Sequence, residues 1–165
     1  NIFNGSIVAI VAGGTIEIVT TNGDNSTGFP AGTIGVFVGC SYTDPNSSQK
    51  VFRQSWPAST VASDAMAYIV DDPDCLFQVQ ADGAVTQADL GQNTHLAAVQ
   101  STSTGSTTTG NSTSAVTATT ATTSGFAFRI VDFVDGPESE VGDAFTDLIV
   151  KFNPDSHSYT NKTGI

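Results

Sequence analysis

The chain has 165 residues and a mass of 17.0 kDa, a length that fits one domain. Sixteen Asp and Glu residues against five Lys and Arg residues give a net charge of -11. Nucleic acid and anionic membrane surfaces repel so acidic a chain, which excludes them as expected partners. No apolar run approaches the ~20 residues that a membrane-spanning helix needs, so no membrane segment is expected either.

The N-terminal part of the chain predicts a β-hairpin. Two runs rich in β-branched residues, Ser6–Val11 and Thr15–Thr20, are separated by a Gly-Gly turn. In the second run Ile16 and Ile18 alternate with polar residues, the pattern of a strand with one wet face.

Runs of β-branched and aromatic residues, separated by turn residues, recur to the end of the chain. Further strands are predicted at 33–40, 50–56, 65–70, 75–80, 126–134 and 145–152, with turns that include Asn22–Asn25, Asp71–Asp74 and Asp135–Pro137. The strands at 65–70 and 75–80 resemble a second hairpin, and 86–99 is the one stretch with a weak helical pattern. We therefore predict an all-β fold, a compact barrel or sandwich of about seven to eight mainly antiparallel strands in a single domain over 1–165.

The segment Ser101–Ser124 has low complexity, because 17 of its 24 residues are Ser or Thr. Alone it cannot form a core, which favours a mobile loop or linker within the domain. A solvent-facing β-hairpin that turns at Gly110-Asn111 is the alternative, since Thr favours strands. The C-terminal tail, 153–165, is polar and is predicted to be loosely held.

Residues with catalytic potential are few. His95 and His157 are the only histidines, neither lies near a G-x-S-x-G motif, and both are expected at the surface. Asp71-Asp72-Pro73-Asp74 has carboxylates for calcium, but it lacks the EF-hand spacing, and the same residues form turns. We predict no catalytic, cofactor or metal residues and no enzyme activity. Cys40 and Cys75 are expected to be buried free thiols, because no signal peptide is visible.

A candidate protein interface lies in the strand at 50–56. Lys50 and Arg53 are two of only five basic residues, and Phe52 and Trp56 are predicted to share one face. An apolar strand beside cations suits docking on an acidic or mixed protein surface. The preferred interpretation of the two aromatic residues is that they fill the core, and the interface is the alternative.

Several segments resemble a family of tailed-bacteriophage virion structural proteins that is common in marine and cyanobacterial phages. The resemblance is most specific from the tyrosine of the 65–70 strand through the DDPD turn, and it covers most of the chain. The segments that carry it are Gly39–Pro45, Phe52–Thr60, Ala67–Asp74, Leu76–Gln80, Ala88–Asn93, the Thr-rich stretch, Phe128–Val134 and Gly164-Ile165.

The resemblance implies a capsid decoration (cement) protein on the outer surface of the virion head. It implies the major capsid protein as partner and self-association as a homo-oligomer, with a trimer favoured over a dimer. Family members also carry an additional N-terminal segment before the position of Asn1. The alternatives are a tail or baseplate adhesion component and, with less support, a secreted hydrolase or carbohydrate-binding module. The single Trp argues against the last, since glycan platforms use several exposed aromatic residues.

Overall fold

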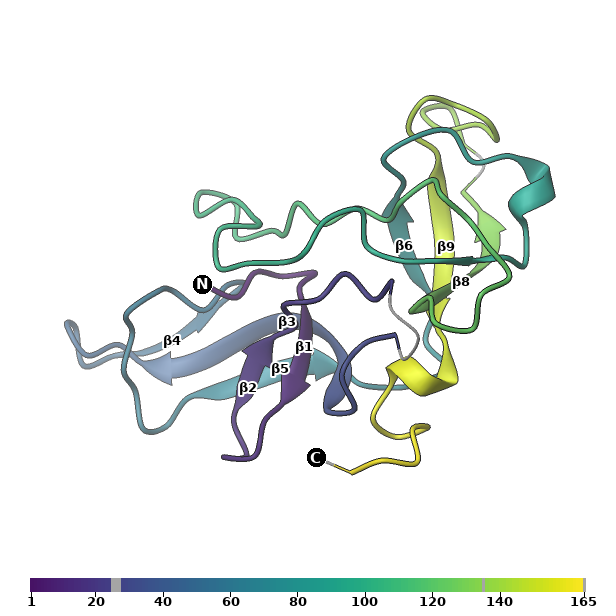
Figure 1. Cartoon of the computed structure of the whole chain (residues 1–165). Helices are drawn as coiled ribbons and strands as arrows, with labels where there is room; N and C mark the ends of the chain where they lie inside the picture. The colour runs from purple at the N-terminus through teal and green to yellow at the C-terminus, as the bar shows by residue number, and fades with distance from the viewer. Residues whose placement is uncertain (25–27, 135, 165) are drawn as a thin grey trace.

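The computed structural model describes residues 1–24, 28–134 and 136–164. Within these residues the protein is nearly all-β, with antiparallel sheets of five and four strands, as predicted (Figure 1). The helical parts described are two 3₁₀ turns, η1 (Gln87–Asp89) and η2 (Pro154–Ser156). Asn25 and Asp135 of the predicted turns, and Ile165 of the tail, lie outside the described residues.

The first sheet is built around β3 (Thr33–Thr43), the longest strand. One edge of β3 pairs with β5 (Met66–Val70). Its other edge pairs first with β1 (Ile7–Ile10) and, farther along, with β4 (Lys50–Arg53). The predicted hairpin is confirmed, since β2 (Ile16–Ile18) pairs with β1.

The two faces of the first sheet contact different parts of the molecule. Ile7 and Ala9 pack in a core cluster with the second sheet, and we call this side the junction face. Val8, Phe37 and other residues of the opposite side form a separate cluster, and we call that side the groove face. Register shifts between Val8/Ala9 and between Phe37/Gly39 interrupt the simple alternation of β3, so that Ile34 and Val36, two residues apart, pack in different clusters.

The second sheet has the order β6-β9-β8-β7, and its strands are β6 (Phe77–Gln80), β9 (Asp147–Phe152), β8 (Phe128–Phe133) and β7 (Asn93–Thr94). The Ser/Thr-rich segment links its two edges. Val116 forms bridges with both Ala81, after β6, and Leu96, after β7. The Val116 amide donates to the Gln80 carbonyl at 3.0 Å, and the Asp82 amide donates to the Val116 carbonyl at 2.8 Å. The second sheet is thereby closed into a ring.

The Ser/Thr-rich segment is a loop without a regular strand in the described residues. It turns at Gly110, as the hairpin alternative predicted, and its path crosses from the second sheet to the N-terminus (Figure 1), where Asn4 bridges Asn111. It does not face solvent throughout, because Val116 is 1% exposed. One apolar residue anchors an otherwise polar segment in the core.

The C-terminal tail packs against the body, contrary to the prediction of a loosely held end. Ser156 and His157 are buried, and the Ser156 hydroxyl accepts a hydrogen bond from the Phe29 amide at 3.2 Å. The Ser158 amide donates to the Thr33 carbonyl at 2.6 Å, which ties the tail to β3. The prediction failed because polar composition does not reveal which hydroxyl and imidazole groups find buried partners.

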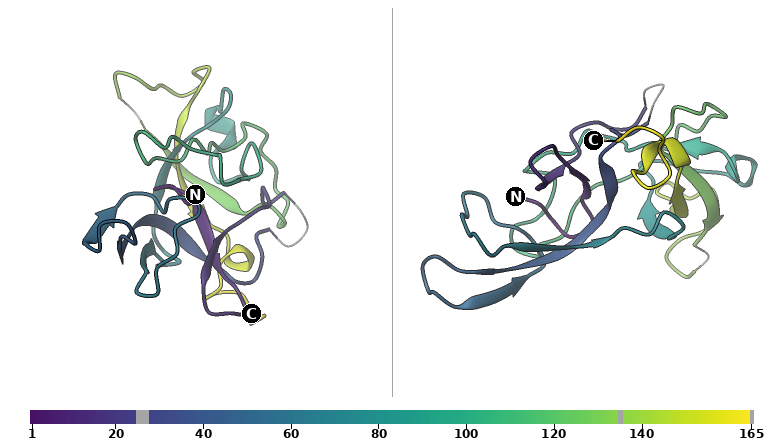
Figure 2. Two further views of the ribbon diagram at one scale, coloured as in Figure 1. Left: turned by 90° about the vertical axis from the view of Figure 1, so that its left-hand side faces the viewer. Right: turned by 90° about the horizontal axis from the view of Figure 1, so that it is seen from below.

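Most predicted strands are confirmed, with β3 three residues longer than expected and β7 not expected at all. The second predicted hairpin is wrong. β5 pairs with β3 and β6 pairs with β9, so the chain crosses from one sheet to the other between them. The Asp71–Asp74 segment is a turn as predicted, with the Asp72 side chain accepting from the Asp74 amide at 2.8 Å, but it connects two sheets. The two sheets form a compact, sandwich-like arrangement, as predicted, and β4 lies at the end of the first sheet away from the second sheet (Figure 1 and Figure 2).

Candidate functional site

Phe52, the centre of the predicted interface, is exposed. It lies in β4 opposite Ser41 of β3, and its side chain is 74% exposed. The preferred interpretation, that Phe52 fills the core, is therefore wrong. β4 lies away from the second sheet (Figure 1), and no described element covers this part of the junction face.

Trp56 lies on the other side of the sheet. Its ring packs against Tyr42 with centroids 4.9 Å apart, and its backbone pairs with Ile2. The core interpretation holds for Trp56, which is half-buried against the cluster of the groove face. The prediction that it shares a face with Phe52 is wrong, because β4 ends at Arg53 and a bend interrupts the strand period.

The two cations of the predicted interface differ in their partners. Lys50 lies on the same face as Phe52 and forms an ion pair with Asp64 at 2.9 Å. Hydrogen bonds from the Thr43 amide, from Lys50 and from the Thr43 hydroxyl hold the pKa of Asp64 well below its usual range. Arg53 lies on the opposite face, is exposed and forms no ion pair within the described residues.

Phe52 is part of an apolar patch on the uncovered half of the junction face. Ser41 pairs with Phe52 on one side and with Met66 on the other, so these side chains lie in one row across three strands. Met66 is 60% exposed, and Tyr68 and Val38 are each 42% exposed. The Tyr68 hydroxyl donates to the Ser41 hydroxyl at 3.0 Å, which satisfies the buried Ser41. We call Val38, Phe52, Met66 and Tyr68 the apolar patch.

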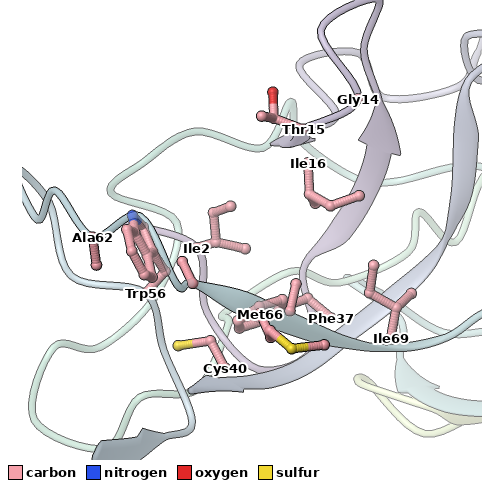
Figure 3. Close-up of a pocket in the computed structure, with 12 residues that line it drawn as sticks. Ile2, Gly14, Thr15, Ile16, Phe37, Cys40, Trp56, Ala62, Met66 and Ile69 are labelled. Atoms are coloured by element: carbon pink, nitrogen blue, oxygen red, sulfur yellow. The ribbon is translucent and has the colours of Figure 1, made fainter. Parts of the chain in front are cut away.

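The groove face contains a hollow of about 520 Å³, drawn in Figure 3. Ile69 and Ala67 of β5 line one side, and Ile16 at the start of β2 lines the other. Cys40 and Phe37 contribute from β3, and burial raises the pKa of the Cys40 thiol. The remaining lining residues are Ile2, Gly14, Thr15, Trp56, Ala62, Ala65 and Met66. Met66, the first residue of β5, thus borders the hollow as well as the apolar patch. We call this hollow the inner groove, and its lining among the described residues carries no charged side chain.

The residues weighed for catalysis are dispersed. His95 is half-buried and makes an edge-to-face contact with Phe126, with ring centroids 4.6 Å apart. His157 is buried, contrary to prediction, and burial lowers its pKa despite opposing contributions from the Ile34 backbone, Asp71 and Asp72. In the described part of the chain, no group of three His, Cys, Asp or Glu residues could hold a metal ion.

The two cysteines are free thiols, with Cys40 buried and Cys75 half-buried. Residues 1–24, 28–134 and 136–164 include no helix long and apolar enough to span a bilayer. Comparison with protein-family models, with curated proteins and with solved structures finds no match to this chain.

Proposed function

We propose that the chain is a non-enzymatic decoration protein, which binds the outer surface of a phage head and stabilises the lattice of the major capsid protein. The observation that carries this proposal is the apolar patch around Phe52. Large apolar side chains gathered on an ordered sheet face favour a protein-binding surface, because exposing them to water is costly. The sequence resemblance supplies the identity of the partner.

The distribution of charge also favours binding through the apolar patch. Beside Phe52 on the junction face, the charge of Lys50 is balanced by its ion pair with Asp64, whereas the chain as a whole carries a charge of -11. A docked protein that buries the apolar patch leaves most carboxylates in solvent, where mutual repulsion keeps decorated particles apart. Self-association as a small oligomer, with a trimer preferred, would multiply the patches that engage the lattice.

The proposal is tested by adding the purified chain to phage heads that lack it and measuring the bound fraction by co-sedimentation. We expect Phe52→Ser to reduce binding strongly, since Phe52 is the most exposed member of the patch. Phe145→Ser is the matched control, because Phe145 is 60% exposed but lies in the segment before β9. Equal binding by wild type and Phe52→Ser, or equal loss in both variants, would contradict the proposal.

A further inference from the structure

The outer edge of β5 carries backbone groups without a partner in the described residues. The strand order of the first sheet places β3 on one side of β5 and no strand on the other. Within the described residues, no backbone hydrogen bond outside the strand ladders involves Met66–Val70. Backbone amides and carbonyls favour pairing, so a free edge is a template for an added strand.

β5 lacks the features that keep strand edges from pairing. The other edge strands of the first sheet carry charges, since β4 contains Lys50 and Arg53 and β2 contains Glu17. β5 has the sequence MAYIV, without a charge or a proline. The carboxylate that precedes it, Asp64, is neutralised by its ion pair with Lys50. The edge is therefore uncharged along its length, and its start carries no net charge.

A strand added to β5 must be apolar on both of its faces. On the side of the apolar patch it would lie beside Met66 and Tyr68, which are exposed. On the other side it would lie beside Ala67 and Ile69, which line the inner groove. A strand that alternates apolar and charged side chains suits one of these sides and places its charges against the other.

The β5 strand of a second copy meets both requirements. Antiparallel pairing of two identical strands about a twofold axis at Tyr68 aligns all five residues. Tyr68 then lies opposite Tyr68 of the second copy, as an aromatic cross-strand pair. Met66 lies opposite Val70 on the same side of the sheet. On the groove side, the small and exposed Ala67 lies opposite the larger Ile69. Apolar side chains meet at every position of this register.

The other free edge of the first sheet fits β5 less well. In β2, Glu17 alternates with Ile16 and Ile18, and these two isoleucines pack with the inner side of the sheet. Pairing of β2 with β5 of another copy would therefore set Glu17 beside Met66 or Tyr68, where nothing balances its charge. The composition of the two edges favours pairing of β5 with itself.

We propose that two copies of the chain associate by antiparallel pairing of their β5 strands, which joins the two first sheets into one continuous sheet. Edge-to-edge pairing extends the apolar patch without covering it, because the row from Phe52 through Ser41 to Met66 continues into Val70 of the second copy. A twofold contact closes on itself, so the structure favours a dimer in place of the trimer that the sequence resemblance implies. The inference does not depend on whether the chain decorates a capsid.

The association state of the full chain is measured by sedimentation velocity at concentrations up to about 100 µM. We expect a species of twice the 17.0 kDa mass of one chain. Because each copy carries a charge of -11, added salt should strengthen the association. A monomer throughout this range, or a trimer, would overturn the proposal.

A charged variant assigns the contact to β5. Ala67→Glu places a carboxylate opposite the Ile69 side chain of the second copy, so the dissociation constant of the dimer should rise at least about tenfold. Ala67 is exposed in the single chain, so the variant should fold, which circular dichroism checks. Val141→Glu adds the same charge at an exposed position between β8 and β9 and should dimerise as wild type does. Equal dimerisation of the two variants would overturn the assignment to β5.

Disulfide cross-linking tests the register, in a chain whose half-buried Cys75 is replaced by serine. Tyr68→Cys places thiols on directly opposed residues, whose Cα separation of roughly 4.5 to 5.5 Å suits a disulfide. We expect oxidation to link this variant and not Phe52→Cys, which lies in the same patch but two strands from the pairing edge. Linkage of Phe52→Cys alone would assign the dimer to a face-to-face contact of the apolar patches and overturn pairing through β5. A dimer in which neither variant is linked would overturn the register at Tyr68.

Discussion

The second sheet is closed by a segment of its own chain, whereas in the first sheet the outer edges of β2 and β5 have no strand partner among the described residues. In the second sheet, Val116 bridges Ala81 and Leu96, and the core behind it contains Ile130, Leu148 and other fully buried side chains. In the first sheet, the equivalent position holds the inner groove, lined by half-buried residues such as Ile16 and Ile69. The two sheets therefore differ in how they end: the second is closed within the chain, whereas the first has a buried cluster of its own but leaves part of its surface apolar and exposed.

The largest expected effect comes from breaking the closure of the second sheet. Val116→Asp would bury a carboxylate without a partner, so we expect it to lower the free energy of unfolding by about 4 kcal/mol. Thr107→Asp is the control, because Thr107 is exposed in the same segment and should change stability by less than about 0.5 kcal/mol. Urea unfolding measures both. Similar stability of the two variants would show that Val116 does not close the sheet.

A somewhat smaller effect is expected from disturbing the open sheet at the β3–β5 contact. Gly35 has a φ of +139°, and an added Cβ would collide with the backbone carbonyl of Val70. Gly35→Ala should therefore lower the free energy of unfolding by about 3 kcal/mol.

Gly136→Ala is the matched control for Gly35→Ala, since a Cβ at Gly136 meets no atom of the described structure within 4 Å. Thermal unfolding of the two variants is the measurement. A Gly35→Ala protein as stable as the control would mean that β5 does not hold this close contact with β3.

The smallest expected effect concerns the tail that joins the two sheets. His157 packs against Phe152 of β9, with ring centroids 5.6 Å apart, and the adjacent Ser158 is bonded to β3. Because burial lowers the pKa of folded His157, the unfolded chain binds a proton more readily below its ordinary pKa of about 6.5. Stability contributed by neutral His157 is thus present above that pKa and declines as the pH falls through it.

Urea unfolding between about pH 7.5 and about pH 5.5 measures this decline. His157→Phe, which retains an aromatic ring but does not titrate, should show a shallower slope in that range. Equal slopes in wild type and His157→Phe would contradict a depressed pKa at this residue.

Local patterns were sufficient to predict most strands, although not β7, and only the pairing of strands that are adjacent in the sequence. The alternation of Ile16 and Ile18 and the Gly-Gly turn identify the β1–β2 hairpin, because both signals lie within a few residues. The pairing of β5 with β3 joins segments some thirty residues apart and depends on which edge is free, which no local pattern records.

The candidate site could be predicted only in part for the same reason. Lys50 and Arg53 were identified from the rarity of cations in this chain, and Phe52 from its strand spacing with Trp56. Met66 and Val38 complete the apolar patch through cross-strand register, and Ile16 and Ile69 form the groove through the curl of the sheet. The role of Val116 was missed because the surrounding composition is polar, although it is the one large apolar residue in Ser101–Ser124.

The most direct test of the proposed decoration role is the copy number and position of the chain in purified virions, by quantitative protein analysis combined with particle imaging. The account predicts density at regular sites over the outside of the head and a fixed copy ratio to the major capsid protein. A small number of copies confined to the tail would contradict it in favour of an adhesion role, and absence from the particles would contradict a structural role altogether.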